Sequence, residues 1–373
     1  MSEKFLNKKI KKFPPYSLNS EINLDNIKIK MDANESFFNL PDFILQEVQT
    51  NLKNIDFNRY PDPSALALIK KFAEYLKSSE NINLDINNIA AGNGSDELLN
   101  IIINLFISKD EKILVFEPDF SMYAFYGEII EANIIRAAKT VGRDVPGVPL
   151  KIDWSEALDL LKRENIKLAV FSNPCNPTGQ LENKKDIKKF IELAERTGTV
   201  IILDEVYMSF CDGRESFIHE LLDYPNLIII KSLSKSIGLA SLRVGFALSN
   251  ETFINAVKTV KSPFNLNGVS QKTAEIILSY PAYLEQNLQT LKQNKKDLQD
   301  KLNKIIKIIP TETNFIIIES DNSRKIFNYL LENKILVRNL NNKYLRITSG
   351  SAEENEELLK CLRKYQEKQK KQK

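Results

Sequence analysis

The sequence has very few of the residues on which most metal sites depend. Among 373 residues there is one histidine, His219, and there are three cysteines, Cys175, Cys211 and Cys361. Without a Cys-x-x-Cys pair or a second histidine, a transition-metal site built on these residue types is close to excluded, and we expect no metal. Acid–base chemistry must then fall to Lys, Tyr, Asp or Glu. The odd, widely spaced cysteines argue against a disulfide framework and favour a reducing, cytoplasmic location.

The chain also lacks a charge excess of one sign and any long apolar run. A formal net charge of +3 argues against a nucleic-acid-binding protein, because such proteins usually carry a one-sided basic surface. Apolar runs such as 200–203 and 227–230 are too short to span a bilayer. No apolar segment follows the lysines at positions 8, 9, 11 and 12, so we expect neither a signal peptide nor a membrane-bound protein.

Helical patterns alternate with short apolar runs over residues 42–231. Continuous apolar runs between helices are typical of a parallel sheet covered on both faces, which predicts an α/β architecture. The predicted helices are 42–53, 64–78, 95–107, 153–164 and 183–197, and the predicted strands are 112–116, 167–172, 199–204 and 226–231.

The C-terminal third has a different pattern, which indicates a smaller α+β domain. We expect a long helix over 270–308 and a closing helix from about 352, with a solvated, frayed tail after residue 362. Between them the pattern predicts strands at 314–318, 335–338 and 344–348 and a helix at 322–333. Residues 1–40 are polar and contain several prolines, and they look like an extended arm.

The strongest chemical motif is KSLSKSIGLASLRVGF, which directly follows an apolar strand. Burial favours the neutral form of a lysine, and a neutral amine such as Lys235 can form an imine. Ser232, Ser234 and Arg243 can donate hydrogen bonds to a phosphate. Taken alone, Lys235 fits an exposed loop position about equally well.

Three further motifs follow predicted strands or begin helices. Asp204 ends an apolar strand, where a buried carboxylate needs a cationic partner such as a protonated pyridine nitrogen, or else caps the next segment. Asn176 lies in the rigid turn SNPCNPTG, which also fits an ordinary Asn-Pro turn. The loop GNGSDE precedes a helix, whose free N–H groups bind anions. That loop is neither a Walker A loop nor a GxGxxG motif.

In this order, the motifs resemble those of the fold-type I pyridoxal-phosphate aminotransferases, and within them the histidinol-phosphate aminotransferase subfamily. The resemblance covers nearly the whole chain. It is carried also by Pro15-Tyr16, Asp32-Ala33-Asn34-Glu35, Asn58-Arg59-Tyr60-Pro61-Asp62, Pro263-Phe264-Asn265, Thr313-Asn314-Phe315 and Leu345-Arg346-Ile347-Thr348. It implies a large domain over 40–265 with a mainly parallel seven-stranded sheet. A smaller domain over 266–373 would pack with an N-terminal arm, 1–39.

The same resemblance implies pyridoxal 5′-phosphate as the cofactor, held by Lys235 as a Schiff base. Lys235 would also carry the proton between substrate and cofactor, and Asp204 would pair with the pyridine nitrogen. Asn176 and Tyr207 would hold the ring O3′, and Phe120 would stack on the ring. The remaining implied cofactor contacts are Gly94, Ser95, Asp96, Ser232, Ser234 and Arg243 at the phosphate, and Tyr60 from the neighbouring subunit of a homodimer.

Four residues match substrate-binding positions of the subfamily: Tyr16, Asn34, Arg338 and Arg346. Arg346 would bind an anionic group, and Arg338 and Tyr16 would recognise a phosphate. A phosphate dianion is better served by two cations and a hydroxyl than by one arginine. The implied reaction converts histidinol phosphate and 2-oxoglutarate into imidazole-acetol phosphate and glutamate, in histidine biosynthesis.

Three departures from the subfamily pattern leave the substrate open. The loop from 338 to 346 is short, the stretch 139–150 is unusual, and the turn Asn34-Glu35-Ser36-Phe37 replaces the usual Asn-Glu-Asn-Pro. An aminotransferase for aromatic amino acids and an O-phosphothreonine decarboxylase share the same cofactor motifs, and both stay alternatives. Arg338 and Tyr16 fit surface and packing roles as well.

Overall fold

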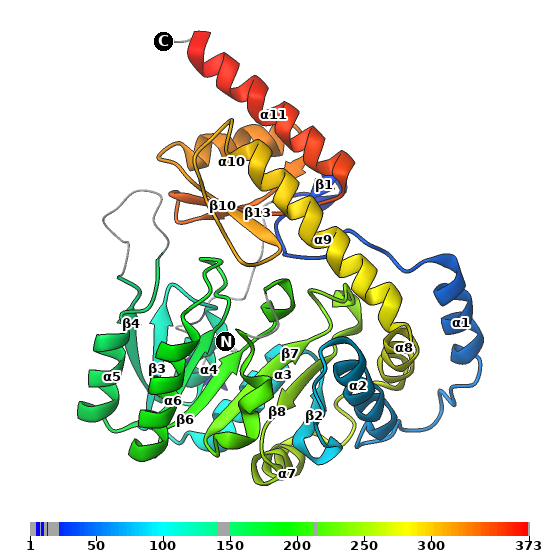
Figure 1. The fold of residues 1–373 in the computed structure, drawn as a ribbon, viewed down its shortest axis with the longest axis vertical. Coiled ribbons are helices and arrows are strands. Elements are labelled where there is room, and N and C mark those ends of the chain that lie inside the picture. Colours follow the sequence, from blue (N-terminus) through cyan, green and yellow to red (C-terminus); the bar gives the residue numbers. More distant parts are fainter. Residues whose placement is uncertain are drawn as a thin grey trace.

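A mostly parallel sheet organises the larger part of the molecule in the computed structural model, which describes residues 5–7, 9–10, 13, 22–140, 150–211 and 215–371. Within these residues seven strands pair in the order β2-β8-β7-β6-β5-β3-β4 (Figure 1). Only β8 runs antiparallel to its neighbours. The strands are β2 (Ile89–Gly92), β3 (Lys112–Glu117), β4 (Asn133–Ala138), β5 (Ile166–Ser172), β6 (Val200–Asp204), β7 (Leu227–Ser232) and β8 (Gly245–Leu248).

Both faces of this sheet are buried, which explains the continuous apolar runs of its strands. In β5, Ala169 and Phe171 pack into one hydrophobic cluster, and Leu168 and Val170 pack into another. Successive side chains of a strand point to opposite faces, so each face needs its own cover. The α/β class and the mainly parallel seven-stranded sheet predicted for the chain are therefore confirmed.

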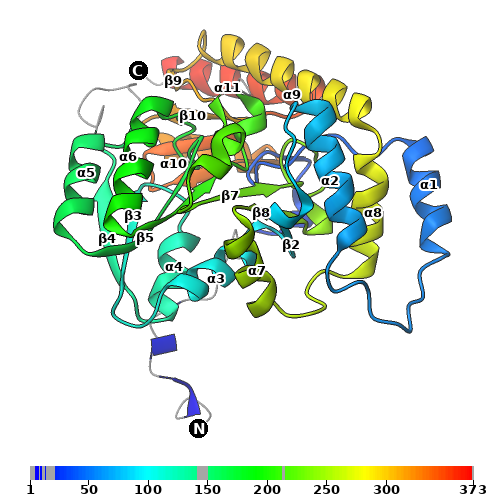
Figure 2. The same cartoon turned by 60° about the horizontal axis from the view of Figure 1, so that its bottom comes forward.

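Helices cover the two faces unequally. One face carries α2 (Leu66–Ser79), α5 (Trp154–Arg163), α6 (Lys184–Thr197) and α8 (Gly268–Leu278). The opposite face carries α3 (Ser95–Phe106), α4 (Met122–Ile129) and α7 (Glu251–Val260) (Figure 2). The helix α1 (Asp42–Leu52) packs on α8 at the outside of the first layer. No helix in the described ranges is long and apolar enough to cross a membrane.

A second, smaller sheet has its own core. Its strands are β9 (Ile308–Ile309), β10 (Phe315–Glu319), β12 (Arg338–Leu340) and β13 (Tyr344–Thr348), in the order β12-β13-β10-β9. The helices α10 (Ser323–Glu332) and α11 (Ala352–Lys371) pack on it. A short strand of the N-terminal segment, β1 (Ile29–Lys30), pairs in parallel with β11 (Ile335–Leu336) and joins this core.

Two predictions for the C-terminal third were wrong in detail. The single helix expected over 270–308 is two helices, α8 and α9 (Pro281–Leu302). Pro281 is the first residue of α9, where a missing N–H costs nothing, but it cannot continue a preceding helix. The tail after residue 362 is not frayed in the described residues, because α11 continues to Lys371 and buries Tyr365.

The core changes inside α9 rather than at residue 265. Leu284, near its start, belongs to the cluster under the large sheet, whereas Leu298 and Leu302 belong to the cluster of the small sheet. Figure 1 shows α9 running from α8 to the layer of β10 and β13. The division at residues 39 and 265 stays a prediction, and the packing of α8 on the large core favours a later second boundary.

Candidate active site

A cavity of about 760 Å³ opens along the carboxyl edge of the large sheet and faces the small sheet. In α/β sheets this is the edge at which ligands bind. Its walls are formed by residues that follow β3, β5, β6 and β7 and by side chains of β9, β10, β12 and β13. The predicted site residues that line it are Asn34, Ser95, Asp96, Phe120, Asn176, Asp204, Tyr207, Ser232, Ser234, Lys235, Arg243, Arg338 and Arg346.

Three predicted residues are not among these walls. Tyr16 lies outside the described residues. Gly94 lies just behind the wall, so close to Arg243 that a Cβ on it would be 2.6 Å from Nη2 of that arginine. Tyr60 is 80% exposed and stacks on Phe264, with ring centroids 4.4 Å apart. Its predicted contact requires a second copy of the chain and stays a prediction.

Lys235 lies three residues beyond β7, and its amine reaches into the cavity. Nζ donates a hydrogen bond of 3.0 Å to the carbonyl of Ala33. Burial, followed by the positive charge of Arg346, lowers the pKa of Lys235 to about 8. About a tenth of the amine is then neutral at pH 7, far more than for an exposed lysine. The side chain is therefore suited to attack a carbonyl carbon.

Asp204, the last residue of β6, is only 4% exposed. Tyr123 Oη donates to its Oδ2 at 2.8 Å, and the backbone N–H of Val206 donates to Oδ1 at 3.1 Å. Burial nevertheless raises the pKa of Asp204 to about 7. A carboxylate held in this way calls for a cationic partner from the cavity side. Tyr123 was not predicted, although its position early in the helix after β3 was a usable signal.

An anion cradle is formed where α3 begins beside the turn before β8. Gly94 adopts φ +88°, and the helix starts at Ser95 with its free N–H groups toward the cavity. Gly245 allows β8 to lie against the start of α3, because a Cβ at this position would be only 2.4 Å from the Ser95 nitrogen. Arg243 is in a left-handed conformation, φ +53°, and its Nη1 lies 3.5 Å from Ser234 Oγ.

A second polar group lies across the cavity and involves residues far apart in sequence. Asn34 Nδ2 donates to Tyr207 Oη at 2.8 Å. Arg346 donates from Nη1 to Asn176 Oδ1 and from Nη2 to the carbonyl of Asp32, both at 2.6 Å. These bonds join the N-terminal segment, the large sheet and the small sheet around one cavity.

Two arginines lie side by side on the small sheet. In the antiparallel pairing of β12 with β13, Arg338 and Arg346 are direct partners. Like charges placed directly opposite each other destabilise a sheet. Both side chains line the cavity, so the arrangement is suited to a ligand with more than one negative charge.

The comparisons with known proteins agree with this geometry. The model of the family described as aminotransferase class I and II matches residues 26–362. The chain belongs to this aminotransferase family. A histidinol-phosphate aminotransferase of Clostridium kluyveri is 36% identical, over 98% of this chain and 99% of its own length.

Solved structures of similar proteins have the same fold as this chain. The structure of the Clostridium acetobutylicum histidinol-phosphate aminotransferase has a TM-score of 0.80 and 25% identity, covering 91% of this chain and 100% of its own. The Sinorhizobium meliloti histidinol-phosphate aminotransferase, solved in complex with pyridoxal-5′-phosphate, has a TM-score of 0.84 and 22% identity, with coverages of 97% and 98%. The prediction of a fold-type I aminotransferase is thus confirmed.

The family implies pyridoxal phosphate as the cofactor, and the residues of this aminotransferase fit that molecule. A lysine whose pKa is lowered, a buried carboxylate and an anion cradle with one arginine surround the same cavity. They match an aldehyde, a basic ring nitrogen and a phosphate, respectively. Among the described residues, no group of three or more His, Cys, Asp and Glu side chains is arranged to hold a metal ion.

Proposed function

We propose that this aminotransferase uses pyridoxal phosphate to transfer the amino group of histidinol phosphate to 2-oxoglutarate, in histidine biosynthesis. The products would be imidazole-acetol phosphate and glutamate. The observation that carries the choice of substrate is the pair Arg338 and Arg346, which are cross-strand partners on the cavity wall. The names of the similar curated proteins support the same choice.

The two arginines would bind an anionic substrate from different environments. Arg346 is buried and fixed by Asn176 and the Asp32 carbonyl, so it presents its guanidinium in one orientation. Arg338 is half-buried and one strand further out. A phosphate dianion placed between them would accept charge-assisted hydrogen bonds from both. An uncharged aromatic side chain would accept none of these bonds.

Bound pyridoxal phosphate would supply an electron sink that stabilises negative charge at the substrate α-carbon. Lys235 is placed to hold the cofactor and then to move the proton of that carbon, because its lowered pKa lets it act as a base near neutral pH. Asp204 would keep the ring nitrogen protonated, and the hydroxyl of Tyr123 would hold Asp204 in position.

The other lining residues would orient the cofactor. Phe120 would lie on one ring face, and Asn176 and Tyr207 would bind O3′ from the side where Asn34 and Arg346 already contact them. The phosphate would occupy the cradle of Ser95, Asp96, Ser232, Ser234 and Arg243, with Gly94 providing the space.

The proposal includes a homodimer in the cytoplasm. Tyr60 and Phe264 form an exposed stacked pair away from this chain's own cavity, and exposed aromatic side chains of this kind favour a protein interface. Tyr60 would then reach the cofactor phosphate of the partner subunit, and Tyr16 would help bind the substrate phosphate. The cysteines at 175, 211 and 361 are all free, which fits a reducing compartment.

The first experiment is a spectral titration of the purified, cofactor-loaded protein with histidinol phosphate in the absence of a 2-oxo acid. We expect the yellow absorbance to disappear with one equivalent of substrate and to return when 2-oxoglutarate is added. Histidinol without its phosphate should require a much higher concentration, because Arg338 then has no anion to bind.

Two results would redirect the proposal. Loss of colour with phenylalanine but not with histidinol phosphate would indicate an aromatic aminotransferase. Release of carbon dioxide from O-phosphothreonine without use of 2-oxoglutarate would indicate a decarboxylase. A protein that takes up no pyridoxal phosphate would refute the cofactor assignment itself.

A further inference from the structure

A buried ion pair lies at the cavity wall, of which Asp119 forms a part, and has no role in the function described so far. Asp119 follows β3, Lys139 follows β4, and Ser172 ends β5. These three strands are neighbours in the sheet, so the three residues meet at its carboxyl edge. The exposed fractions of the Lys139 and Asp119 side chains are 0% and 3%, and the Nζ to Oδ2 distance is 3.1 Å.

The carboxylate of Asp119 accepts four hydrogen bonds. Oδ2 accepts from Lys139 Nζ at 3.1 Å and from the Ser172 nitrogen at 3.2 Å. Oδ1 accepts from the Phe120 nitrogen at 2.8 Å and from Ser172 Oγ. All lone-pair directions of the carboxylate are thus used by groups at the cavity wall.

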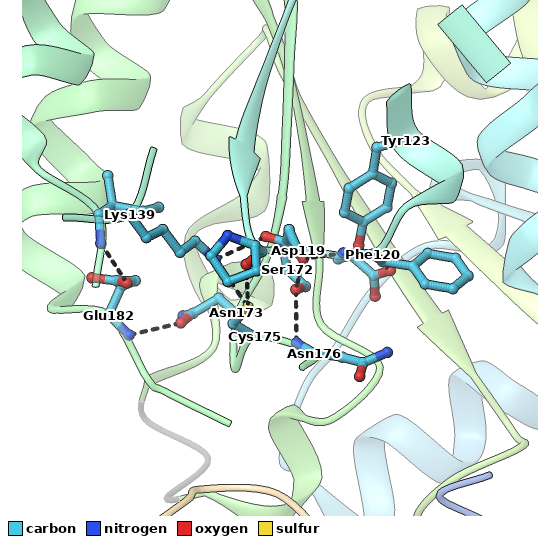
Figure 3. Close-up of polar contacts among 12 residues, drawn as sticks. Asp119, Phe120, Tyr123, Lys139, Ser172, Asn173, Cys175, Asn176 and Glu182 are labelled. Atoms are coloured by element: carbon cyan, nitrogen blue, oxygen red, sulfur yellow. Dashed lines mark hydrogen bonds and ion pairs between the residues drawn. The ribbon is translucent and has the colours of Figure 1, made fainter. Parts of the chain in front are cut away.

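Two of these contacts connect Asp119 to the cavity-lining residues Phe120 and Asn176, one directly and one through Ser172 (Figure 3). The Phe120 nitrogen is bound by Asp119 itself. Asn176 is reached through one intermediate, because its backbone nitrogen donates to Ser172 Oγ at 3.1 Å. One carboxylate therefore fixes the backbone of Phe120 directly and that of Asn176 through Ser172.

Lys139 makes this arrangement possible. A buried carboxylate without a cation would be costly, and removing one partner of a buried pair leaves the other uncompensated. Burial by itself lowers the pKa of Lys139, but the charges of Asp119 and Cys175 and the hydrogen bonds to them together outweigh it and raise the pKa above its usual value. The ammonium also lies 2.9 Å from Cys175 Sγ, in the same turn as Asn176, as Figure 3 shows. Lys139 therefore contacts this turn directly through Cys175 and indirectly through Asp119 and Ser172.

We infer that Asp119, held by Lys139, is a positioning residue that fixes Phe120 and Asn176 at the geometry needed to clamp the cofactor ring. The inference rests on the proposed function, in that the ligand of the cavity is pyridoxal phosphate. It does not depend on which amino-group donor is the substrate. Neither Asp119 nor Lys139 is assigned a contact with the reacting atoms.

The test measures cofactor binding by full-length apoprotein in a set of variants. Asp119→Ala removes the acceptor of the Phe120 nitrogen and of the Ser172 hydroxyl that binds Asn176. Lys139→Met leaves the carboxylate without its cation. We expect each to weaken pyridoxal phosphate binding by about tenfold or more and to reduce the visible circular dichroism of the bound ring. The double variant Asp119→Asn with Lys139→Met keeps an acceptor oxygen and buries no charge. It should recover binding to within about threefold of wild type.

Two control variants separate positioning from general stability. Lys112→Met breaks a half-exposed ion pair with Glu164, of 2.7 Å, at the opposite end of β3, and should leave binding unchanged. Ile187→Ala makes a cavity in the large core away from the site and should lower Tm without changing the circular dichroism of the bound ring.

The outcomes are distinct. If Asp119→Ala and Lys139→Met lower Tm as Ile187→Ala does but bind pyridoxal phosphate within about twofold of wild type, the pair is only structural and the inference is wrong. If either single variant does not fold, the other single variant and the double variant decide the matter by the same comparison. A wild-type protein that takes up no pyridoxal phosphate would refute the proposed function, which is a separate result.

Discussion

Replacing Arg338 by leucine should separate substrate recognition from stability, because the two effects differ in size. In the free protein Arg338 and Arg346 are cross-strand partners, and the buried carboxylate of Asp32 interacts with both positive charges. Arg338 is half-buried, so its ion-pair contribution is small and Tm should fall by no more than a few degrees. With histidinol phosphate bound, the same change removes a charge-assisted hydrogen bond to the phosphate.

The magnitude follows from the position of the side chain. Hydrogen bonds to charged groups contribute about 1.5–3 kcal/mol, and the lower end applies here because Arg338 is half-buried and partly screened by water. A loss of about 1.5 kcal/mol corresponds to roughly a tenfold increase in KM. Turnover at saturation should change much less, because Arg338 has no proposed part in the proton transfer by Lys235.

Steady-state kinetics with histidinol phosphate and with histidinol give the assay. The wild type should prefer the phosphorylated substrate, and Arg338→Leu should lose most of that preference. Arg324→Leu is a matched control, because it removes the same charge from an exposed position on α10. A rise of less than about threefold in KM for histidinol phosphate, or an equal rise in KM for both substrates, would contradict the proposed role of Arg338.

Four other predictions concern the cofactor and the substrate anion. Lys235→Ala should abolish transamination while circular dichroism shows an intact fold; turnover near that of wild type would contradict the mechanism. Because the pKa of Lys235 is lowered to about 8, the rate of cofactor uptake by apoprotein should rise about tenfold per pH unit below pH 8 and level off above it. A plateau reached only above pH 10 in stopped-flow traces would count against the assignment. Tyr123→Phe removes a hydrogen bond that lowers the pKa of Asp204, so cofactor affinity should fall by about fivefold; a change below twofold would show that Tyr123 has no such role. Arg346→Ala should weaken substrate binding far more than cofactor binding, and equal losses in the two titrations would mean that its role is misassigned.

The sequence predicted those parts of the site that lie within single motifs. Asp204, Asn176 and Lys235 each follow a buried strand within a few residues, and the carboxyl ends of parallel strands meet at one edge. The strand order then determines that these side chains surround one cavity. The motifs therefore indicate from the sequence alone that these residues share one site. Of the predicted site residues, 13 line the cavity.

The parts that were missed depend on pairing and register. Asp119 and Lys139 lie 20 residues apart and meet only because β3 and β4 pair in parallel with Glu117 opposite Ala138. Nothing in a single sequence determines that register. The strands β2, β4 and β8 were also missed, since β2 and β8 are only four residues long and β4 contains an arginine. The break between α8 and α9 was overlooked because the helical pattern continues through Pro281.

Because the two ends of α9 belong to different cores, this helix links the position of the small sheet to that of the large sheet. A helix of 22 residues is about 33 Å long, so a tilt of roughly 5° about its first turn would displace its far end by about 3 Å. That displacement exceeds the 2.6 Å length of the bond from Arg346 to Asn176. A tilt of that size would be enough to separate Arg346 from Asn176, so the site stays assembled only while the two sheets keep their present orientation.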